Sequence, residues 1–114
     1  MTDLAAYVTE AQHQAAIIEL ASVCGWHWYV VPDSRMCPAG WPDLVLVRPP
    51  HILFIECKTE RGRVRPAQRE WLDLLSRCDR VAVRVWRPGD WDEIEATLAG
   101  GTGGQITEWT GGES

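Results

Sequence analysis

Two short apolar segments that carry charged residues constrain the fold of this chain most. They are Gly40-Trp41-Pro42-Asp43-Leu44-Val45-Leu46-Val47 and Phe54-Ile55-Glu56-Cys57-Lys58. We predict a strand over residues 43–47, which Pro49-Pro50 stops, and a second strand over residues 51–58. Their Leu, Val and Ile content predicts burial on both faces, and their closeness in sequence predicts that they pair as a hairpin.

The charged residues of the two strands are expected to meet at one strand end. Side chains alternate along a strand, so Glu56 and Lys58 point the same way while Cys57 points opposite. Asp43 opens the neighbouring strand, and hairpin pairing brings it close to both. A Mg²⁺ between the two carboxylates would remove their repulsion, and the backbone carbonyl of Cys57 would complete the shell. With Lys58 to orient water or offset charge, this is what a metal-dependent phosphodiesterase needs.

Each fragment alone has an ordinary explanation. Glu-x-Lys on a strand is often a surface ion pair, and Pro-Asp at a strand start is often a turn. Here both fragments occur on adjacent apolar strands between two helices. A shared catalytic site therefore explains them as well as the two ordinary interpretations do.

The remaining segments predict a single α/β domain with the order α-β-β-β-α-β-α. Capping boxes open the first and last helices, with Thr9 and Asp90 as N-caps. Pro66 suits the first turn of the middle helix. We expect residues 1–99 to form the domain and residues 100–114, rich in Gly, Thr and Ser, to form a flexible tail. The predicted helices cover residues 9–24, 66–78 and 90–100, and the predicted strands cover residues 26–31, 43–47, 51–58 and 81–86.

The net charge of −5 conceals a basic segment. Residues 58–69 hold five cations and one acid, a local charge of +4, whereas six acids and no base follow from Asp90 onward. A basic segment beside an acidic site is the footprint expected of a nuclease that uses metal. A solvated arginine-rich loop is the alternative on charge alone, and loop polarity explains Arg35 equally well. The arginines expected to contact DNA are Arg61, Arg63, Arg65, Arg69 and Arg35.

The cysteines and the apolar content exclude several other classes. The four cysteines are far apart and form no Cys-x-x-Cys pair, which argues against a zinc ribbon and a disulfide scaffold. Their wide spacing also disfavours an iron–sulfur cluster. No window is apolar enough for a membrane span, and the N-terminus lacks the regions of a signal peptide. We therefore expect a cytoplasmic protein with no membrane partner and no nucleotide cofactor.

Five segments together resemble one known family. They are Thr9-Glu10-Ala11-Gln12-His13-Gln14, Gly40-Trp41-Pro42-Asp43-Leu44, Phe54-Ile55-Glu56-Cys57-Lys58-Thr59-Glu60-Arg61-Gly62, Pro66-Ala67-Gln68-Arg69-Glu70-Trp71-Leu72, and Val83-Arg84-Val85-Trp86-Arg87-Pro88 with Asp90-Trp91. The chain resembles the VRR-NUC (virus-type replication–repair nuclease) family of the PD-(D/E)xK superfamily from about Thr9 to Leu98. The resemblance implies a restriction-endonuclease-like core, in which helices flank a mixed four-stranded sheet.

The resemblance also implies roles for individual residues. Asp43 and Glu56 match the metal-binding acids, and Lys58 matches the catalytic lysine. Glu10 matches a helical acid that approaches the metal, often through water, and Gln68 matches a glutamine that lines the site. For Glu10 an interaction with the helix dipole is an equal alternative, and for Gln68 a solvated helix position is.

The chain departs from the family pattern at two positions. Arg65 stands where the family often has serine before Pro-x-Gln, which removes a helix N-cap and adds a charge facing the phosphates. Cys57 stands where leucine is common, and we expect only a packing change because its side chain points away from the metal.

These features predict a Mg²⁺- or Mn²⁺-dependent, structure-specific DNA endonuclease. Stand-alone members of the resembled family, typical of phages and bacteria, look like Holliday-junction resolvases. The resemblance therefore implies a homodimer that acts on four-way junctions. It also implies a bacterial or phage-infected cell as the setting. One alternative is a flap- or nick-directed repair nuclease that works alone or with a helicase partner. The other is a DNA-binding module without activity, against which the intact Asp43, Glu56 and Lys58 argue.

Overall fold

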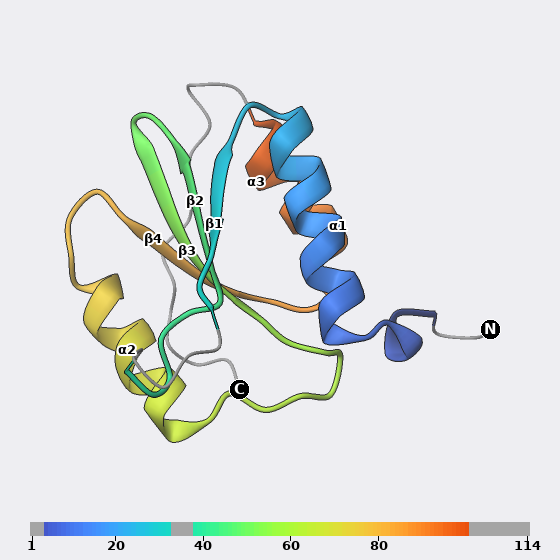
Figure 1. Cartoon of the computed structure of the whole chain (residues 1–114), viewed down its shortest axis with the longest axis horizontal. Helices are drawn as coiled ribbons and strands as arrows, with labels where there is room; N and C mark the ends of the chain where they lie inside the picture. The colour runs from blue at the N-terminus through green and yellow to red at the C-terminus, as the bar shows by residue number, and fades with distance from the viewer. Residues whose placement is uncertain (1–3, 33–37, 101–114) are drawn as a thin grey trace.

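The chain folds into a four-stranded sheet flanked by three α-helices (Figure 1). The computed structural model describes residues 4–32 and 38–100. The order α-β-β-β-α-β-α is confirmed, and two 3₁₀ helices, η1 and η2, are added to it. The predicted tail beyond Gly100 and the expected DNA contact Arg35 lie outside the described residues. In chain order the elements are η1 (Leu4–Tyr7), α1 (Glu10–Val23), β1 (His27–Val30), β2 (Leu44–Arg48), β3 (His51–Cys57), α2 (Pro66–Ser76), β4 (Ala82–Trp86), η2 (Pro88–Asp90) and α3 (Trp91–Ala99).

The sheet is mixed, with the strand order β1-β2-β3-β4. β1 pairs with β2 and β2 with β3 in antiparallel fashion, whereas β3 and β4 are parallel and α2 connects them. In the β2–β3 hairpin, Leu44 lies across from Ile55. The same register continued by one residue places Asp43 across from Glu56, which is the pairing that the predicted site requires.

Both faces of the sheet are covered, as the apolar content of β2 and β3 predicts. α1 and α3 lie together on one face and α2 lies on the other (Figure 1). The core under α1 and α3 contains Ile17, Ala21, Leu44, Leu46, Leu53, Ile55, Cys57, Trp86, Ile94 and Leu98. The smaller core under α2 contains Val64, Leu72 and Val83 with Phe54, Leu75 and Val85. Because alternate residues of β3 enter opposite cores, Cys57 is buried under α1 and Glu56 faces the α2 side. No helix in the described part of the chain is long and apolar enough to cross a bilayer.

Of the two predicted capping boxes, one is confirmed and one is wrong. At α1 the Gln12 amide donates to the Thr9 hydroxyl, and the Gln12 side chain accepts from the Thr9 amide. Asp90 makes no side-chain cap for α3, because its carboxylate accepts the Arg87 amide that begins η2. Glu93, the predicted partner of that box, instead accepts the indole N–H of Trp86 at 2.7 Å.

The loop ahead of β2 packs closely against the start of α2. Gly40 has φ +87°, and a Cβ there would lie 2.4 Å from the carbonyl carbon of Ala67 and 2.7 Å from the amide nitrogen of Gln68. Trp41 adds an edge-on contact with Trp71 of α2, with ring centroids 4.8 Å apart. The loop that leads into Asp43 therefore holds the first turn of α2 at a fixed place.

We expect Gly40→Ala to lower the free energy of unfolding by about 2–5 kcal/mol. The left-handed backbone costs about 1–2 kcal/mol and the clash with α2 about 1–3 kcal/mol more. Gly25→Ala is the matched control, since Gly25 has φ +85° but its Cβ would meet only the Arg48 side chain at 3.9 Å. Urea unfolding of both variants measures the difference, and equal losses would show that the contact with α2 contributes nothing.

Candidate active site

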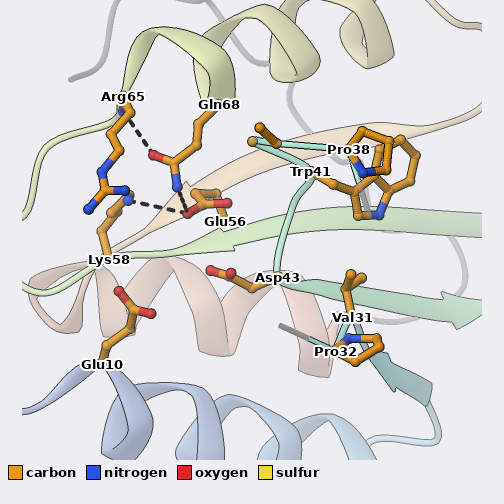
Figure 2. A pocket seen from close by; sticks show the side chains of 12 residues that line it. Glu10, Val31, Pro32, Pro38, Trp41, Asp43, Glu56, Lys58, Arg65 and Gln68 are labelled. Atoms are coloured by element: carbon orange, nitrogen blue, oxygen red, sulfur yellow. Dashed lines mark hydrogen bonds and ion pairs between the residues drawn. The ribbon is translucent and has the colours of Figure 1, made fainter. Parts of the chain in front are cut away.

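The ends of β2 and β3 open into a polar pocket of about 420 Å³. The sheet, the first turn of α1, the first turn of α2 and the loop ahead of β2 all contribute to its wall (Figure 2). Five residues singled out from the sequence for catalysis therefore line one space. The lining residues are Glu10, Val31, Pro32, Pro38, Ala39, Gly40, Trp41, Asp43, Glu56, Lys58, Arg65 and Gln68.

At the centre of the pocket are two carboxylates that interact with each other. Asp43 Oδ2 accepts the backbone amide of Cys57 at 3.0 Å, and the carboxyl groups of Asp43 and Glu56 influence each other's titration. Burial and then the charge of Asp43 raise the pKa of Glu56 to about 8, although Lys58 opposes the shift. Burial likewise raises the pKa of Asp43, against the lowering effect of the Cys57 amide. The two groups therefore hold a proton more tightly than ordinary carboxylates.

Lys58 approaches the pair from the end of β3. Its ammonium Nζ lies 3.3 Å from Glu56 Oε2, and the residue is 7% exposed. Its backbone amide donates to the carbonyl of Trp86 at the end of β4. Glu56 and Lys58 therefore point the same way, as predicted. They form a buried ion pair, in contrast to the surface pair that a Glu-x-Lys motif often makes.

Gln68 connects the pocket to α2. Its side-chain Nε2 donates to Glu56 Oε2 at 2.8 Å, while its Oε1 accepts the Arg65 amide at 2.8 Å. With one side-chain amide, Gln68 therefore both accepts the free backbone N–H of Arg65 at the start of α2 and orients the Glu56 carboxylate. This also explains how α2 begins without a serine N-cap, because the Arg65 side chain makes no cap hydrogen bond.

Glu10 and several arginines lie around this centre. Glu10 extends from the first turn of α1 on the opposite side of the pocket from Gln68 (Figure 2). Arg65 lines the same pocket, whereas Arg61 and Arg63 lie with Arg87 around a second hollow of about 460 Å³. Arg69 is half-buried on α2. The basic loop therefore leads directly from the central pocket to a neighbouring depression.

The donor set fits a divalent cation. Glu56 Oε1 is buried and has no hydrogen-bond partner in the described structure, so this oxygen is available to a cation. Asp43 and Glu56 offer hard oxygen ligands of the kind that Mg²⁺ and Mn²⁺ prefer. Within residues 4–32 and 38–100 no three His, Cys, Asp or Glu side chains gather closely enough to hold an ion alone. The roles of Glu10, acting through water, and of the Cys57 carbonyl as a ligand stay predictions.

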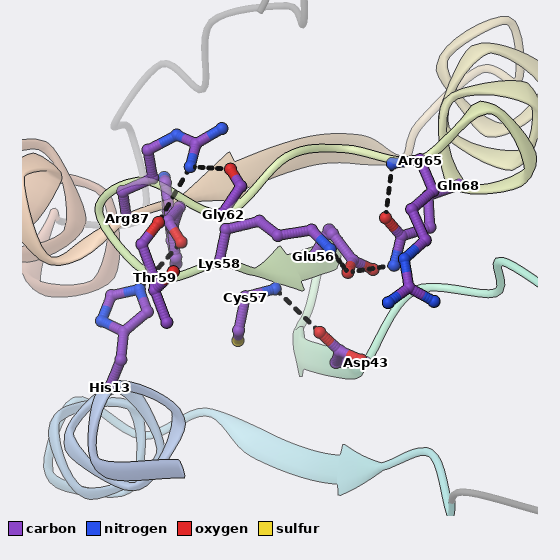
Figure 3. Close-up of polar contacts among 11 residues, drawn as sticks. His13, Asp43, Glu56, Cys57, Lys58, Thr59, Gly62, Arg65, Gln68 and Arg87 are labelled. Carbon is purple, nitrogen blue, oxygen red and sulfur yellow. Dashed lines mark hydrogen bonds and ion pairs between the residues drawn. The ribbon is translucent and has the colours of Figure 1, made fainter. Parts of the chain in front are cut away.

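Two residues with no predicted role make contacts behind the site (Figure 3). His13, 2% exposed, places Nε2 2.8 Å from the Trp86 carbonyl. The Arg87 guanidinium donates to the carbonyls of Thr59 and Gly62, which fastens the turn after Lys58. The only sequence signal for His13 was its position one turn after Glu10 on the same helix.

We expect the metal-free protein to become less stable as the pH rises from about 4.5 to about 8. The folded state raises the pKa of Glu56 from 4.5 to about 8, so its contribution is fully present below pH 4.5 and is lost as the pH approaches 8. A Mg²⁺ ion bound by Glu56 would have to displace the retained proton, so Mg²⁺ should raise the melting temperature more at pH 8 than at pH 6. Thermal unfolding in EDTA and in Mg²⁺ across this range measures both effects.

Glu56→Gln is the control for this dependence, because it keeps the shape and the hydrogen bonds but cannot titrate. The variant should show a nearly flat profile in EDTA and little response to Mg²⁺. A slope as steep as that of the unaltered protein would assign the titration to another group.

Comparison with known proteins agrees with this geometry. Searches of curated proteins and of solved structures found no match. A family model described as the VRR-NUC domain matches residues 6–87, a span that contains α1, the sheet, α2 and every residue of the central pocket. The chain therefore belongs to the VRR-NUC family, whose members are nucleases of the PD-(D/E)xK type that generally use divalent metal ions.

Proposed function

We propose that the protein is a Mg²⁺- or Mn²⁺-dependent, structure-specific DNA endonuclease that resolves four-way junctions as a homodimer. The observation that carries the catalytic part is the buried Asp43–Glu56 pair, with one unsatisfied oxygen and Lys58 alongside. A buried pair of this kind is unfavourable without a cation, and a site that serves only packing has no need of it.

Each residue of the pocket has a distinct part in the proposed reaction. Asp43 and Glu56 would hold the cation, and Gln68 fixes the rotation of the Glu56 carboxylate through Oε2. When bound, the cation would lower the pKa of a water and offset charge on the phosphate. Lys58 is close enough to Glu56 Oε2 to orient that water or to stabilise the extra negative charge as the phosphodiester is attacked. Glu10 faces the same space and would hold a further water.

The arginine loop gives the DNA a path across this surface. Arg65 lines the central pocket, and Arg61, Arg63 and Arg87 surround the adjacent hollow. A strand cut at the central pocket would pass its flanking phosphates along these guanidinium groups. Contacts of this type read the course of the backbone and not the base sequence, as expected for an enzyme that recognises branch shape.

A resolvase makes two symmetric cuts, so the proposal requires a two-fold dimer. The described part of the chain contributes one such pocket, and each subunit would cut one strand. Edge strand β1 exposes Trp28 and Tyr29, 49% and 60% accessible, which are residues of the kind found at protein interfaces. Light scattering should therefore give about twice the chain mass of 12.8 kDa.

We expect the purified protein to make paired cuts in a synthetic four-way junction with Mg²⁺ or Mn²⁺ and none with EDTA. Lys58→Ala should lower the cleavage rate by 10³-fold or more, because several kcal/mol of charge stabilisation are lost in the transition state. Its affinity for the junction should stay within about threefold, since the arginine loop is untouched. Gel assays on the junction, a 5′ flap and a plain duplex measure cleavage and binding together.

The outcomes of this assay separate the candidate functions. Cutting of the flap alone by a monomer would replace the resolvase by a repair nuclease. No cutting of any substrate with either metal would favour a DNA-binding module. An equal loss of binding and cleavage in Lys58→Ala would make Lys58 a phosphate contact.

We expect the double variant Arg63→Ala, Arg65→Ala to flatten the salt dependence of junction affinity. Each lost phosphate contact should reduce the slope of log affinity against log salt by about 0.9, giving about 1.8 for the pair. The control is Arg77→Ala, Arg80→Ala, which removes the same charge near the far end of α2. Equal slopes in the two double variants would place the DNA elsewhere.

A further inference from the structure

His13 connects α1 to the place where Lys58 leaves the sheet. Its Nε2 lies 2.8 Å from the carbonyl oxygen of Trp86, the last residue of β4. The same oxygen accepts the backbone amide of Lys58 at 3.1 Å. The Trp86 carbonyl therefore accepts two hydrogen bonds, one from the His13 side chain on α1 and one from the backbone amide of Lys58, the predicted catalytic lysine.

The protonation state of His13 follows from its partner. A carbonyl oxygen can only accept, so Nε2 must carry the proton. Burial lowers the pKa of His13, although the Trp86 carbonyl and the carboxylates of Asp90, Glu60 and Glu10 oppose the shift. The imidazole is therefore a neutral, buried donor at neutral pH, and it does not act as a cation toward the pocket.

The helical position of His13 makes this contact matter for the site. Glu10 lies three residues earlier and Ile17 four residues later, so all three share one side of α1. Ile17 is fully buried in the core, and Glu10 faces the pocket. The Thr9 capping box is internal to the helix, so it does not attach the first turn to the sheet. The His13 bond does so, and it lies between the core and Glu10.

We infer that His13 is a positioning residue, which holds Glu10 opposite Lys58 by binding the Trp86 carbonyl. This inference rests on the proposed function, because it assigns Glu10 and Lys58 to one reaction. Without the bond, the first turn of α1 would keep its helical form but would lose its fixed distance from the end of β3. Glu10 would then fail to hold its water at the place that Lys58 and Glu56 define.

The experiment compares three substitutions in α1. His13→Leu removes the donor at similar size, and His13→Gln keeps an amide donor at similar reach. Ile17→Val is the packing control, since it removes one buried methyl group from the same side of the helix without touching a polar contact. Junction cleavage gives kcat and KM, and hydrogen exchange of the Lys58 amide, relative to that of Leu53, gives a readout that needs no catalysis.

We expect His13→Leu to lower kcat at least tenfold with KM within twofold, and to accelerate exchange at Lys58 several-fold. His13→Gln should return both quantities to within threefold of the original values. Ile17→Val should lower the melting temperature but leave both unchanged. In a Glu10→Gln background, His13→Leu should have less than a twofold further effect on kcat, because its influence passes through Glu10.

Two results would overturn the inference. The first is that the unaltered protein cleaves normally, but His13→Leu has the same kcat and the same rate of Lys58 exchange as Ile17→Val. The inference would then fail while the proposed function would be retained. The second is that the effects of His13→Leu and Glu10→Gln on kcat are fully additive in the double variant. If the unaltered protein cleaves nothing, yet His13→Leu accelerates exchange at Lys58 and His13→Gln restores it, the attachment holds and the proposed function fails. If His13→Leu does not fold, His13→Asn, whose donor is one methylene shorter, should show the same losses.

Discussion

The repulsion between two buried carboxylates is the constraint on which the rest of this structure depends. Asp43 and Glu56 lie across from each other at the ends of adjacent strands, where little water can screen them. Isolated charges in such a place would destabilise the fold, and the groups that contact the pair are hydrogen-bond donors and a cation. The Cys57 amide serves Asp43, while Gln68 and Lys58 serve Glu56. One oxygen of Glu56 is still without a partner in the described structure, and a divalent cation, which this family generally uses, would satisfy it.

The scaffold keeps this pair fixed from three directions. The β2–β3 register sets the separation of the two carboxylates. The close approach of Gly40 to Ala67 sets the first turn of α2 and, with it, the position of Gln68. The end of β4 positions Lys58, because the Trp86 carbonyl binds the Lys58 amide and the Arg87 side chain binds the turn after Lys58. A polar site of this kind needs rigid support, because a carboxylate that could rotate would escape to water and lose its ligand geometry.

The charge distribution fits the same picture. A net charge of −5 would repel DNA if it were spread evenly. The acids of α3 lie on the helix that covers the other face of the sheet from α2, whereas Arg61, Arg63 and Arg65 lie in the loop that leads to α2 and borders the two pockets. The overall charge therefore says little about the surface that would meet a phosphate backbone.

The sequence by itself determined the parts of this protein that depend on local periodicity and short-range pairing. The element order, the Thr9 capping box, the shared face of Glu56 and Lys58 and the hairpin that aligns Asp43 all follow from neighbours along the chain. Element ends shifted by one or two residues, because fraying and tertiary contacts decide them.

Only the tertiary structure decided which polar groups found one another across long stretches of chain. The hydrogen bonds from Gln68 to Glu56 and from His13 to Trp86 span 12 and 73 residues, and no local pattern encodes them. The predicted capping box at Asp90 failed for a different reason, because nearer donors compete for its carboxylates. The Arg87 amide, three residues before Asp90, and the Trp86 indole, seven residues before Glu93, bind the two carboxylates, which are then not available to cap the helix.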